Sequence, residues 1–388
     1  MEPLQDDDPP VIGGYTLRGR IGVGGMGQVY LGESAAGLQV AVKVIRASVL
    51  DEDTRARFVL EVDSLKTVYG PFVAAFVAAD AYADQPWLAV EYVPGPDLRT
   101  FITDHGPLPL AETASLGALL AEGLHTVHEA GLLHRDLKPQ NILLAGYGPK
   151  LIDFGLAVLA ERRSTLTATG FVVGSVLCMP PEQARGEHDL KQAADVYALG
   201  AVLLYAATGH YPYTGPGWQA VALRIEDPAT PPDLSELPGE LRPTIEAMLA
   251  YDPDARPALD EVTERLVQVI RDCGLTPAQA KRALTERTPE VPLPDLPARP
   301  EHTAYTPTVV DPAAHEDEDD IRPAGPSEPE PRDEQPDDLE PEPTPALAAT
   351  STTPTTPAQR SRDSLSRLSA PLQIAERLRA AYARDARF

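Results

Sequence analysis

The chain has 388 residues, and its 43% hydrophobic content is enough to build a sizeable core for one large two-lobed body or two ordinary domains. The net charge of −25 argues against nucleic acid as a partner, because binding to phosphate backbones needs clustered Lys and Arg. Cys178 and Cys273 are far apart and show no metal-ligand spacing, which favours a reducing, cytoplasmic compartment over a disulfide framework.

The acidic N-terminus lacks the basic and apolar regions of a signal peptide, and we expect residues 1–11 to be disordered. No run in the sequence reaches the ~18 apolar residues of a membrane span. The longest apolar run, Tyr197–Thr208, is typical of a buried core helix. The sequence therefore predicts a protein without a membrane span.

Three short β-rich runs separated by glycine-containing turns come first, over residues 15–21, 28–32 and 38–45. A helix is predicted over residues 51–66, and a further strand over residues 87–93. Helical patterns dominate the following part and are clearest over residues 110–131, 193–209 and 241–252. A strand-rich first part and a helix-rich second part predict an α+β fold with two lobes.

The composition changes near residue 286. Residues 286–345 hold 15 of the 41 prolines and 18 acidic residues against four arginines. We expect residues 286–362 to be a disordered acidic linker, because such a segment cannot bury enough apolar surface to offset its chain entropy. Residues 363–388 are predicted to form an amphipathic helix, with Leu372 and Leu378 on one face.

The stretch "IGVGGMGQVY" contains a G-x-G-x-x-G pattern at Gly22, Gly24 and Gly27. In a dinucleotide-binding fold a helix would follow this pattern, but here another β-rich run follows, which favours a β-hairpin. Glycines at a hairpin tip allow backbone N–H groups to approach phosphate oxygens closely. Taken alone, the pattern is equally consistent with a plain glycine-rich hairpin.

Lys43 lies in the apolar run "VAVKVI", where a charged residue is costly unless an anion meets it. A lysine whose ammonium reaches solvent from an edge strand is the simpler interpretation. Glu61 is the best-placed partner, because Phe58, Val62 and Leu65 mark the inward face of the helix that carries it. A Lys43–Glu61 pair would hold the ammonium ready to bind phosphate groups.

Two further segments make the pattern specific: "HRDLKPQN" at His134–Asn141 and "DFG" at Asp153–Gly155. With the glycine-rich hairpin and the strand lysine, they resemble the signature of eukaryotic-type serine/threonine protein kinases over residues 12–272. The resemblance implies a two-lobed protein kinase fold, with an N-lobe over about 12–92, a C-lobe over about 95–272 and a short helical extension over 273–285. The compact kinase followed by a proline-rich tail is similar to actinobacterial kinases.

The resemblance also implies roles for individual residues. Asp136 would accept the proton of the substrate hydroxyl, and Lys138 would steady the transferring phosphoryl group. ATP and Mg²⁺ (or Mn²⁺) are the implied cofactors, with Asn141 and Asp153 as metal ligands. Backbone groups of Glu91 and Val93 would bind adenine, and Asp97 would reach the ribose. The implied nucleotide-binding residues are Ile21, Gly22, Val23, Gly24, Gly25, Met26, Gly27, Val29, Ala41, Lys43, Val90, Glu91, Val93 and Asp97.

Structural roles follow from the same resemblance. Glu182 would pair with Arg256, and Asp195 would hydrogen-bond the backbone of the "HRD" segment. Cys178 stands where the family has an aromatic residue in the substrate-binding loop, which leaves the peptide preference open. In the polar segment "RRSTLTATG", Thr167 and Thr169 match autophosphorylated residues of bacterial kinases, although a threonine-rich loop can also arise by chance.

Three functions remain open at this stage. The chain can be an active kinase, which phosphorylates serine and threonine residues of protein substrates and, as a homodimer, its own loop in trans. It can be a pseudokinase that acts as a signalling scaffold, although Lys43, Glu61, Asp136, Asn141 and Asp153 are all retained. Lastly, the tail can be the working part and recruit a partner, or it can be an inert solubilising segment.

Overall fold

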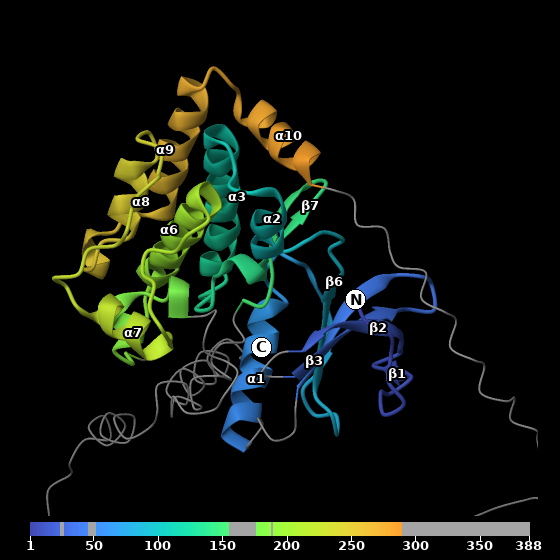
Figure 1. The fold of residues 1–388 in the computed structure, drawn as a ribbon. Helices are drawn as coiled ribbons and strands as arrows, with labels where there is room; N and C mark the ends of the chain where they lie inside the picture. Colours follow the sequence, from blue (N-terminus) through green and yellow to red (C-terminus); the bar gives the residue numbers. More distant parts are fainter. Residues whose placement is uncertain (24–26, 46–51, 155–175, 188, 289–388) are drawn as a thin grey trace, which may run out of the picture. The chain divides into compact units, whose positions relative to one another are not determined.

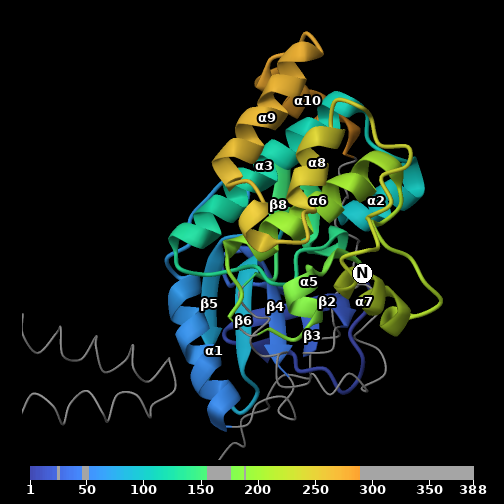
Figure 2. The same ribbon diagram turned by 90° about the vertical axis from the view of Figure 1, so that its left-hand side faces the viewer.

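A six-stranded antiparallel sheet forms the N-terminal part of the computed structural model, which describes residues 1–23, 27–45, 52–154, 176–187 and 189–288. The strand order is β1-β2-β3-β4-β6-β5, and Figure 2 shows most of these strands side by side. The strands are β1 (Val11–Ile12), β2 (Tyr15–Val23), β3 (Gly27–Glu33), β4 (Gln39–Ile45), β5 (Phe76–Asp80) and β6 (Trp87–Glu91).

Helix α1 (Glu52–Leu65) packs against this sheet (Figure 1). Its buried side chains Phe58, Val62 and Leu65 contact a cluster that includes Ile45 and Leu88. This is the inward face that the helical spacing predicts. The sheet and helix together correspond to the predicted N-lobe.

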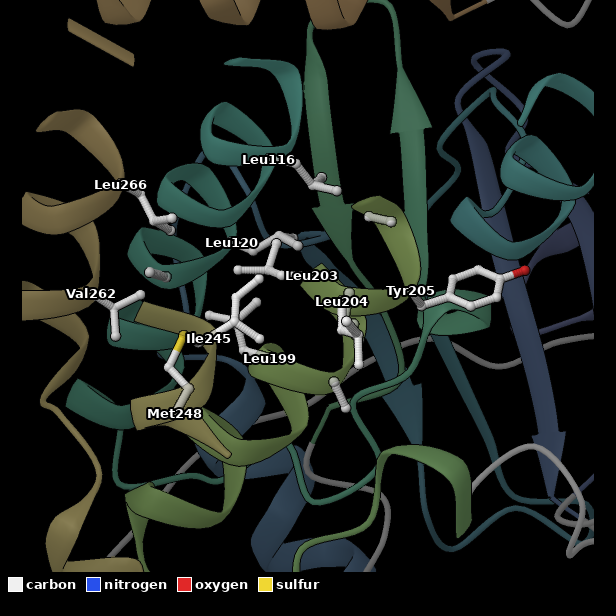
Figure 3. Close-up of a cluster of buried hydrophobic side chains, with 14 of the residues drawn as sticks. Leu116, Leu120, Leu199, Leu203, Leu204, Tyr205, Ile245, Met248, Val262 and Leu266 are labelled. Carbon is white, nitrogen blue, oxygen red and sulfur yellow. The ribbon is translucent and has the colours of Figure 1, made fainter. Parts of the chain in front are cut away.

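The following part is mainly helical. Its helices are α2 (Leu98–His105), α3 (Leu110–Glu129), α5 (Pro181–Ala184), α6 (Gln192–Thr208), α7 (Trp218–Glu226), α8 (Arg242–Met248), α9 (Leu259–Asp272) and α10 (Pro277–Arg287). Leucines of α3 and α6 meet side chains of α8 and α9 in the core drawn in Figure 3. The predicted α+β architecture with two lobes is thus confirmed, and the apolar run 197–208 lies in α6 as a buried helix.

A small hairpin joins the two lobes next to the predicted site. Strands β7 (Ile142–Ala145) and β8 (Gly148–Leu151) form it. Leu151 N donates to Phe72 O at 2.8 Å, and Ala74 N donates to Leu151 O at 2.9 Å. These two hydrogen bonds fix the end of β8 to the segment before β5, so the residues after β8, Asp153 among them, start beside that segment of the N-terminal part.

Helix α10 begins four residues later than the predicted extension, at Pro277, and ends at Arg287. A capping box explains its start, because Thr276 and Gln279 each hydrogen-bond the other's backbone N–H. The expected linker therefore begins inside a helix, at residues 286 and 287. Beyond Thr288 the linker and the predicted helix over 363–388 lie outside the described residues.

The expectation of a disordered segment at residues 1–11 is wrong for this structure. Glu2 and Arg20 exchange two backbone hydrogen bonds of 2.8 Å, and β1 pairs with β2. Asp8 is 5% exposed, and Leu4 packs against a core cluster of the sheet. Composition does not predict this order, because an acidic run is typical of disordered segments. Here Arg20, from within the sheet, binds the carboxylate of Asp8.

Candidate active site

Three predicted site residues lie on the loop between α3 and β7. The carboxylate Oδ2 of Asp136 is 2.6 Å from Lys138 Nζ. Asn141 Nδ2 donates to the backbone O of Asp136 at 2.8 Å. Because the amide nitrogen of Asn141 makes this hydrogen bond, its amide oxygen is the atom that can bind a metal ion. The loop thus holds a carboxylate, an ammonium and an amide oxygen close together.

The backbone of this region is strained at two residues. Arg135 and Asp153 have φ values of 62° and 60°, and in the described part of the chain only Glu236 shares this left-handed conformation among non-glycine residues. Such conformations cost about 1–3 kcal/mol each and persist only where the surrounding structure enforces them. One residue precedes Asp136 and the other is a predicted metal ligand, so the strain lies where the chemistry is expected.

Lys43, on β4, forms an ion pair with Asp153, with Nζ 2.9 Å from Oδ1. Desolvation opposes ionisation of Asp153, but the charge and hydrogen bond of Lys43, together with other nearby positive charges such as Lys138, outweigh it and lower the pKa of the carboxyl group. The side chain of Asp153 remains 39% exposed, and that of Lys43 13%. The pair therefore joins the two lobes and is still open to solvent on the carboxylate side.

The predicted pair between Lys43 and Glu61 is not formed between these two described residues. Lys43 contacts Asp153 instead, and Glu61 lines a cavity of about 410 Å³ whose wall includes His128 and Arg135. Glu61 lies on the inward face of α1, as predicted, and is 8% exposed. The sequence identified the correct face of the helix but not the partner of the ammonium.

Asp195 fixes the backbone before Asp136. This carboxylate is 1% exposed and accepts hydrogen bonds from His134 N at 2.8 Å, Arg135 N at 2.9 Å and His128 Nε2 at 2.7 Å. Its predicted contact with the loop backbone is therefore confirmed. His134 itself is fully buried and packs edge-on against Phe154, and burial lowers its pKa. It is a neutral packing residue.

Packing requires glycine at one of the two described glycine positions of the G-x-G-x-x-G pattern and not at the other. A Cβ on Gly27 would lie 1.7 Å from Val44 O, so close packing of β3 on β4 demands glycine there. A Cβ on Gly22 would meet nothing within 4 Å, so packing does not explain that glycine. Val29 pairs with both Gly22 and Lys43 in the sheet, which places the hairpin beside the strand lysine. Gly24, Gly25 and Met26 lie outside the described residues.

The segment after β6 carries the predicted adenine and ribose contacts. Ala41 and Val90 are cross-strand partners, and Val93 is buried. Asp97 forms the N-cap of α2, with its two carboxylate oxygens accepting from Thr100 N and Thr100 Oγ1. Its observed role is structural, and the ribose contact stays a prediction.

The model of the protein kinase domain family matches residues 15–267 of the chain. The chain belongs to the protein kinase domain family. It is 44% identical over 267 residues to a probable serine/threonine-protein kinase, PkwA, of Thermomonospora curvata, which covers 69% of the chain and 35% of that protein. It is 42% identical over 259 residues to the serine/threonine-protein kinase AfsK of Streptomyces coelicolor, which covers 66% of the chain and 32% of that protein.

The match thus spans about a third of the length of these two relatives. A third relative, the serine/threonine-protein kinase PknK of Mycobacterium tuberculosis, is 36% identical over 324 residues, or 76% of this chain and 28% of that protein. Within the described ranges of this kinase-family chain, no helix is both long and apolar enough to cross a membrane.

Two other predictions for the kinase domain concern its C-lobe. The ion pair between Glu182 and Arg256 is confirmed, with two hydrogen bonds of 2.6 and 2.8 Å. Cys178 is 2% exposed, and burial raises the pKa of its thiol, so it is an inert packing residue in this structure. Thr167 and Thr169 lie outside the described residues.

Sequence reasoning missed a cluster around the side chain of Glu91. Lys150 Nζ lies 2.8 Å from Glu91 Oε2 and Tyr147 OH donates to Oε1 at 3.0 Å, while Lys150 also donates to Val73 O. Burial opposes ionisation of Glu91, but the hydrogen bonds from Lys150, Ala75 N and Tyr147, together with the charge of Lys150, outweigh it and lower the pKa. Lys150 stands between apolar neighbours in a short strand, like Lys43, and that pattern could have indicated a buried anion as its partner.

Proposed function

We propose that this chain transfers the γ-phosphoryl group of ATP to serine and threonine hydroxyls of proteins, in a cytoplasmic setting. One observation carries the proposal: Asp136, Lys138 and Asn141 lie together on one loop, and the Lys43–Asp153 pair stands beside them across the lobes. Phosphoryl transfer depends mainly on positioning and on charge stabilisation, and these five side chains supply both.

Asp136 is the group proposed to take the proton of the attacking hydroxyl. Its side chain is 29% exposed, so a substrate can reach it, whereas the neighbouring His134 is fully buried. Lys138, 2.6 Å from Asp136, carries the positive charge that would stabilise the oxygens of the transferring group. Lys138 in this position is also typical of serine/threonine rather than tyrosine kinases.

The donor set fits Mg²⁺ or Mn²⁺. The amide oxygen of Asn141 and the carboxylate of Asp153 are hard oxygen ligands, which these cations prefer. The described residues contain no group of three His, Cys or acidic side chains that would hold a metal alone, so the nucleotide phosphates would complete the ligand set. When bound, the metal would neutralise charge on those phosphates.

The test is transfer from labelled ATP to a generic protein substrate by the purified full chain with Mg²⁺. Asp136→Asn should reduce the rate by about 10²–10⁴-fold, the usual contribution of a positioned base. Asp63→Asn is the matched control, because Asp63 pairs with Lys66 on the exposed side of α1. Equal labelling by wild type and Asp136→Asn would refute the proposal and leave the scaffold function.

We further propose that the chain phosphorylates Thr167 and Thr169 in trans, as a homodimer. Arg135, directly before Asp136, is the cation that a phosphate on this segment would bind. Phosphosite mapping of active protein should find both residues modified, and a Thr167→Ala, Thr169→Ala variant should transfer phosphate more slowly. An unmodified peptide in fully active protein would contradict this step without affecting the transfer reaction itself.

A further inference from the structure

The N-terminal arm, defined here as residues 2–8, contains a carboxylate that its surroundings hold unusually firmly. Arg20 binds Asp8 through two hydrogen bonds of 2.7 Å, Tyr30 OH donates to it at 2.6 Å, and Gln5 N donates at 2.7 Å. The side chain of Asp8 is 2% exposed. Charge-assisted, two-pronged contacts of this kind fix geometry as well as adding stability.

Asp8 joins both strands of the glycine-rich hairpin near its glycine-containing end. Arg20 lies on β2 and Tyr30 on β3, and the two are cross-strand partners. The next pairs toward the hairpin tip are Gly22 with Val29 and Val23 with Gln28. Asp8, which lies outside the hairpin, therefore binds Arg20 and Tyr30, the cross-strand pair that comes just before Gly22.

The pairing of β2 with β3 is irregular just after Arg20. The register shifts between Arg20 and Gly22, which is a bulge at Ile21. A bulge bends its strand and interrupts the ladder hydrogen bonds, so the course of β2 up to Val23 depends on other contacts. The arm supplies them: Glu2 and Arg20 exchange two backbone hydrogen bonds of 2.8 Å at the outer edge of β2, and Asp8 holds the side chain of Arg20.

We propose that Asp8 is a positioning residue for the glycine-rich hairpin and that the arm sets how closely the hairpin approaches the nucleotide phosphates. The inference rests on the proposed function, because ATP is the ligand concerned. Asp8 acts through Arg20 and Tyr30 and touches no reacting atom. Loss of the contact leaves the chemical groups in place and loosens the described ends of β2 and β3, at residues 21–23 and 27–29.

The experiment compares Asp8→Asn with wild type in the full chain. We expect KM and Kd for MgATP to rise about 3–10-fold, with kcat within about twofold of wild type. This pattern means that the nucleotide is bound less tightly in the ground state and the transition state alike. Glu33→Gln is the matched control, since it breaks an exposed arginine pair, with Arg18, at the far end of the same hairpin. It should leave both constants unchanged.

Amide hydrogen exchange separates positioning from general stabilisation and does not depend on catalysis. Residues 21–23 and 27–29 should exchange faster in Asp8→Asn while β5 and β6 stay protected as in wild type. A uniform rise in exchange, or a lower melting temperature with unchanged Kd for MgATP, would overturn the inference. If wild type binds no nucleotide, the proposed function fails, whereas unchanged exchange over residues 21–23 and 27–29 refutes the positioning role. If Asp8→Asn does not fold, the same measurements are made on Tyr30→Phe, which removes only the hydrogen bond from Tyr30 OH to Asp8.

Discussion

Lys43 Nζ lies 2.9 Å from Asp153 Oδ1, so the lysine of β4 and the acid after β8 form an ion pair across the lobes. Each of the two is proposed to bind a part of the same MgATP complex. The ammonium would bind phosphate oxygens and the carboxylate would bind the metal. Nucleotide binding would then separate two charges that neutralise each other in this structure, and phosphate oxygens would replace Asp153 as the partner of Lys43.

Lys43→Met should reduce phosphoryl transfer by about 10²–10³-fold, because it removes one preorganised positive charge from the phosphate site. The same change should raise the pKa of Asp153, since Lys43 makes the largest contribution to lowering it. The rate is measured with labelled ATP under saturating Mg²⁺. Lys66→Met serves as the control, because Lys66 pairs with Asp63 on the surface. Transfer within tenfold of wild type would contradict the assigned role of Lys43.

Much of the fold and site could be predicted because local patterns carry them. The alternation in β2–β4, the inward face of α1 and the motifs around Asp136 and Asp153 all depend on neighbours in sequence. The partner of Lys43 could not be predicted, because Glu61 and Asp153 both suit an ammonium and only the placement of α1 relative to the sheet decides between them.

The prediction of disorder for the N-terminal arm was wrong for the opposite reason: a contact distant in sequence orders the segment. Its composition is that of a disordered segment, and the contact that orders it, Asp8 with Arg20 and Tyr30, joins residues 12 and 22 positions apart. Asp97 shows a similar limit: the resemblance implied a ribose contact, which stays a prediction, but the sequence did not show that both carboxylate oxygens accept hydrogen bonds from Thr100 at a helix N-cap. Propensity and composition describe single segments, and neither reports which groups meet.

Asp195→Asn should destabilise the chain by about 1–3 kcal/mol and lower kcat. An amide cannot accept all three hydrogen bonds that the carboxylate receives, so at least one buried donor from His128, His134 or Arg135 loses its acceptor. The loop that carries Asp136 then shifts. Denaturant unfolding and steady-state kinetics measure the two effects. Asp233→Asn is the control at an exposed turn, and equal stability of Asp195→Asn and wild type would show that the loop is held in another way.

Arg256→Met should cost about 3–5 kcal/mol of unfolding free energy, because it leaves the buried carboxylate of Glu182 without its cation. The Arg256 side chain is fully buried and also donates to the carbonyl groups of Ala193, Ala250 and Tyr251. A double variant with Glu182→Leu should consequently recover only part of the loss. Arg282→Met, in an exposed pair with Glu286, should cost less than about 0.5 kcal/mol. Full recovery in the double variant would mean that the carbonyl contacts contribute nothing.

The contribution of Asp8 to stability should disappear in acid. Burial opposes its ionisation, but the hydrogen bonds from Arg20, Tyr30 and Gln5 outweigh that effect and lower its pKa to about 2 from 3.8. A carboxyl group whose pKa is lower in the folded state stabilises the fold above the unfolded pKa, and this stabilisation is lost as pH falls toward the folded pKa. The ionised group should thus contribute about 2 kcal/mol at neutral pH.

The measurement is the difference in unfolding free energy between wild type and Asp8→Asn from pH 7 to pH 2. The difference should be constant from neutral pH down to about pH 5 and shrink between about pH 4 and pH 2, because only wild type can gain a proton at this position. Other carboxyl groups titrate in both proteins and cancel in the difference. A difference that stayed the same at pH 3 as at pH 7 would mean that the ionised form of Asp8 is not what holds Arg20 and Tyr30 together.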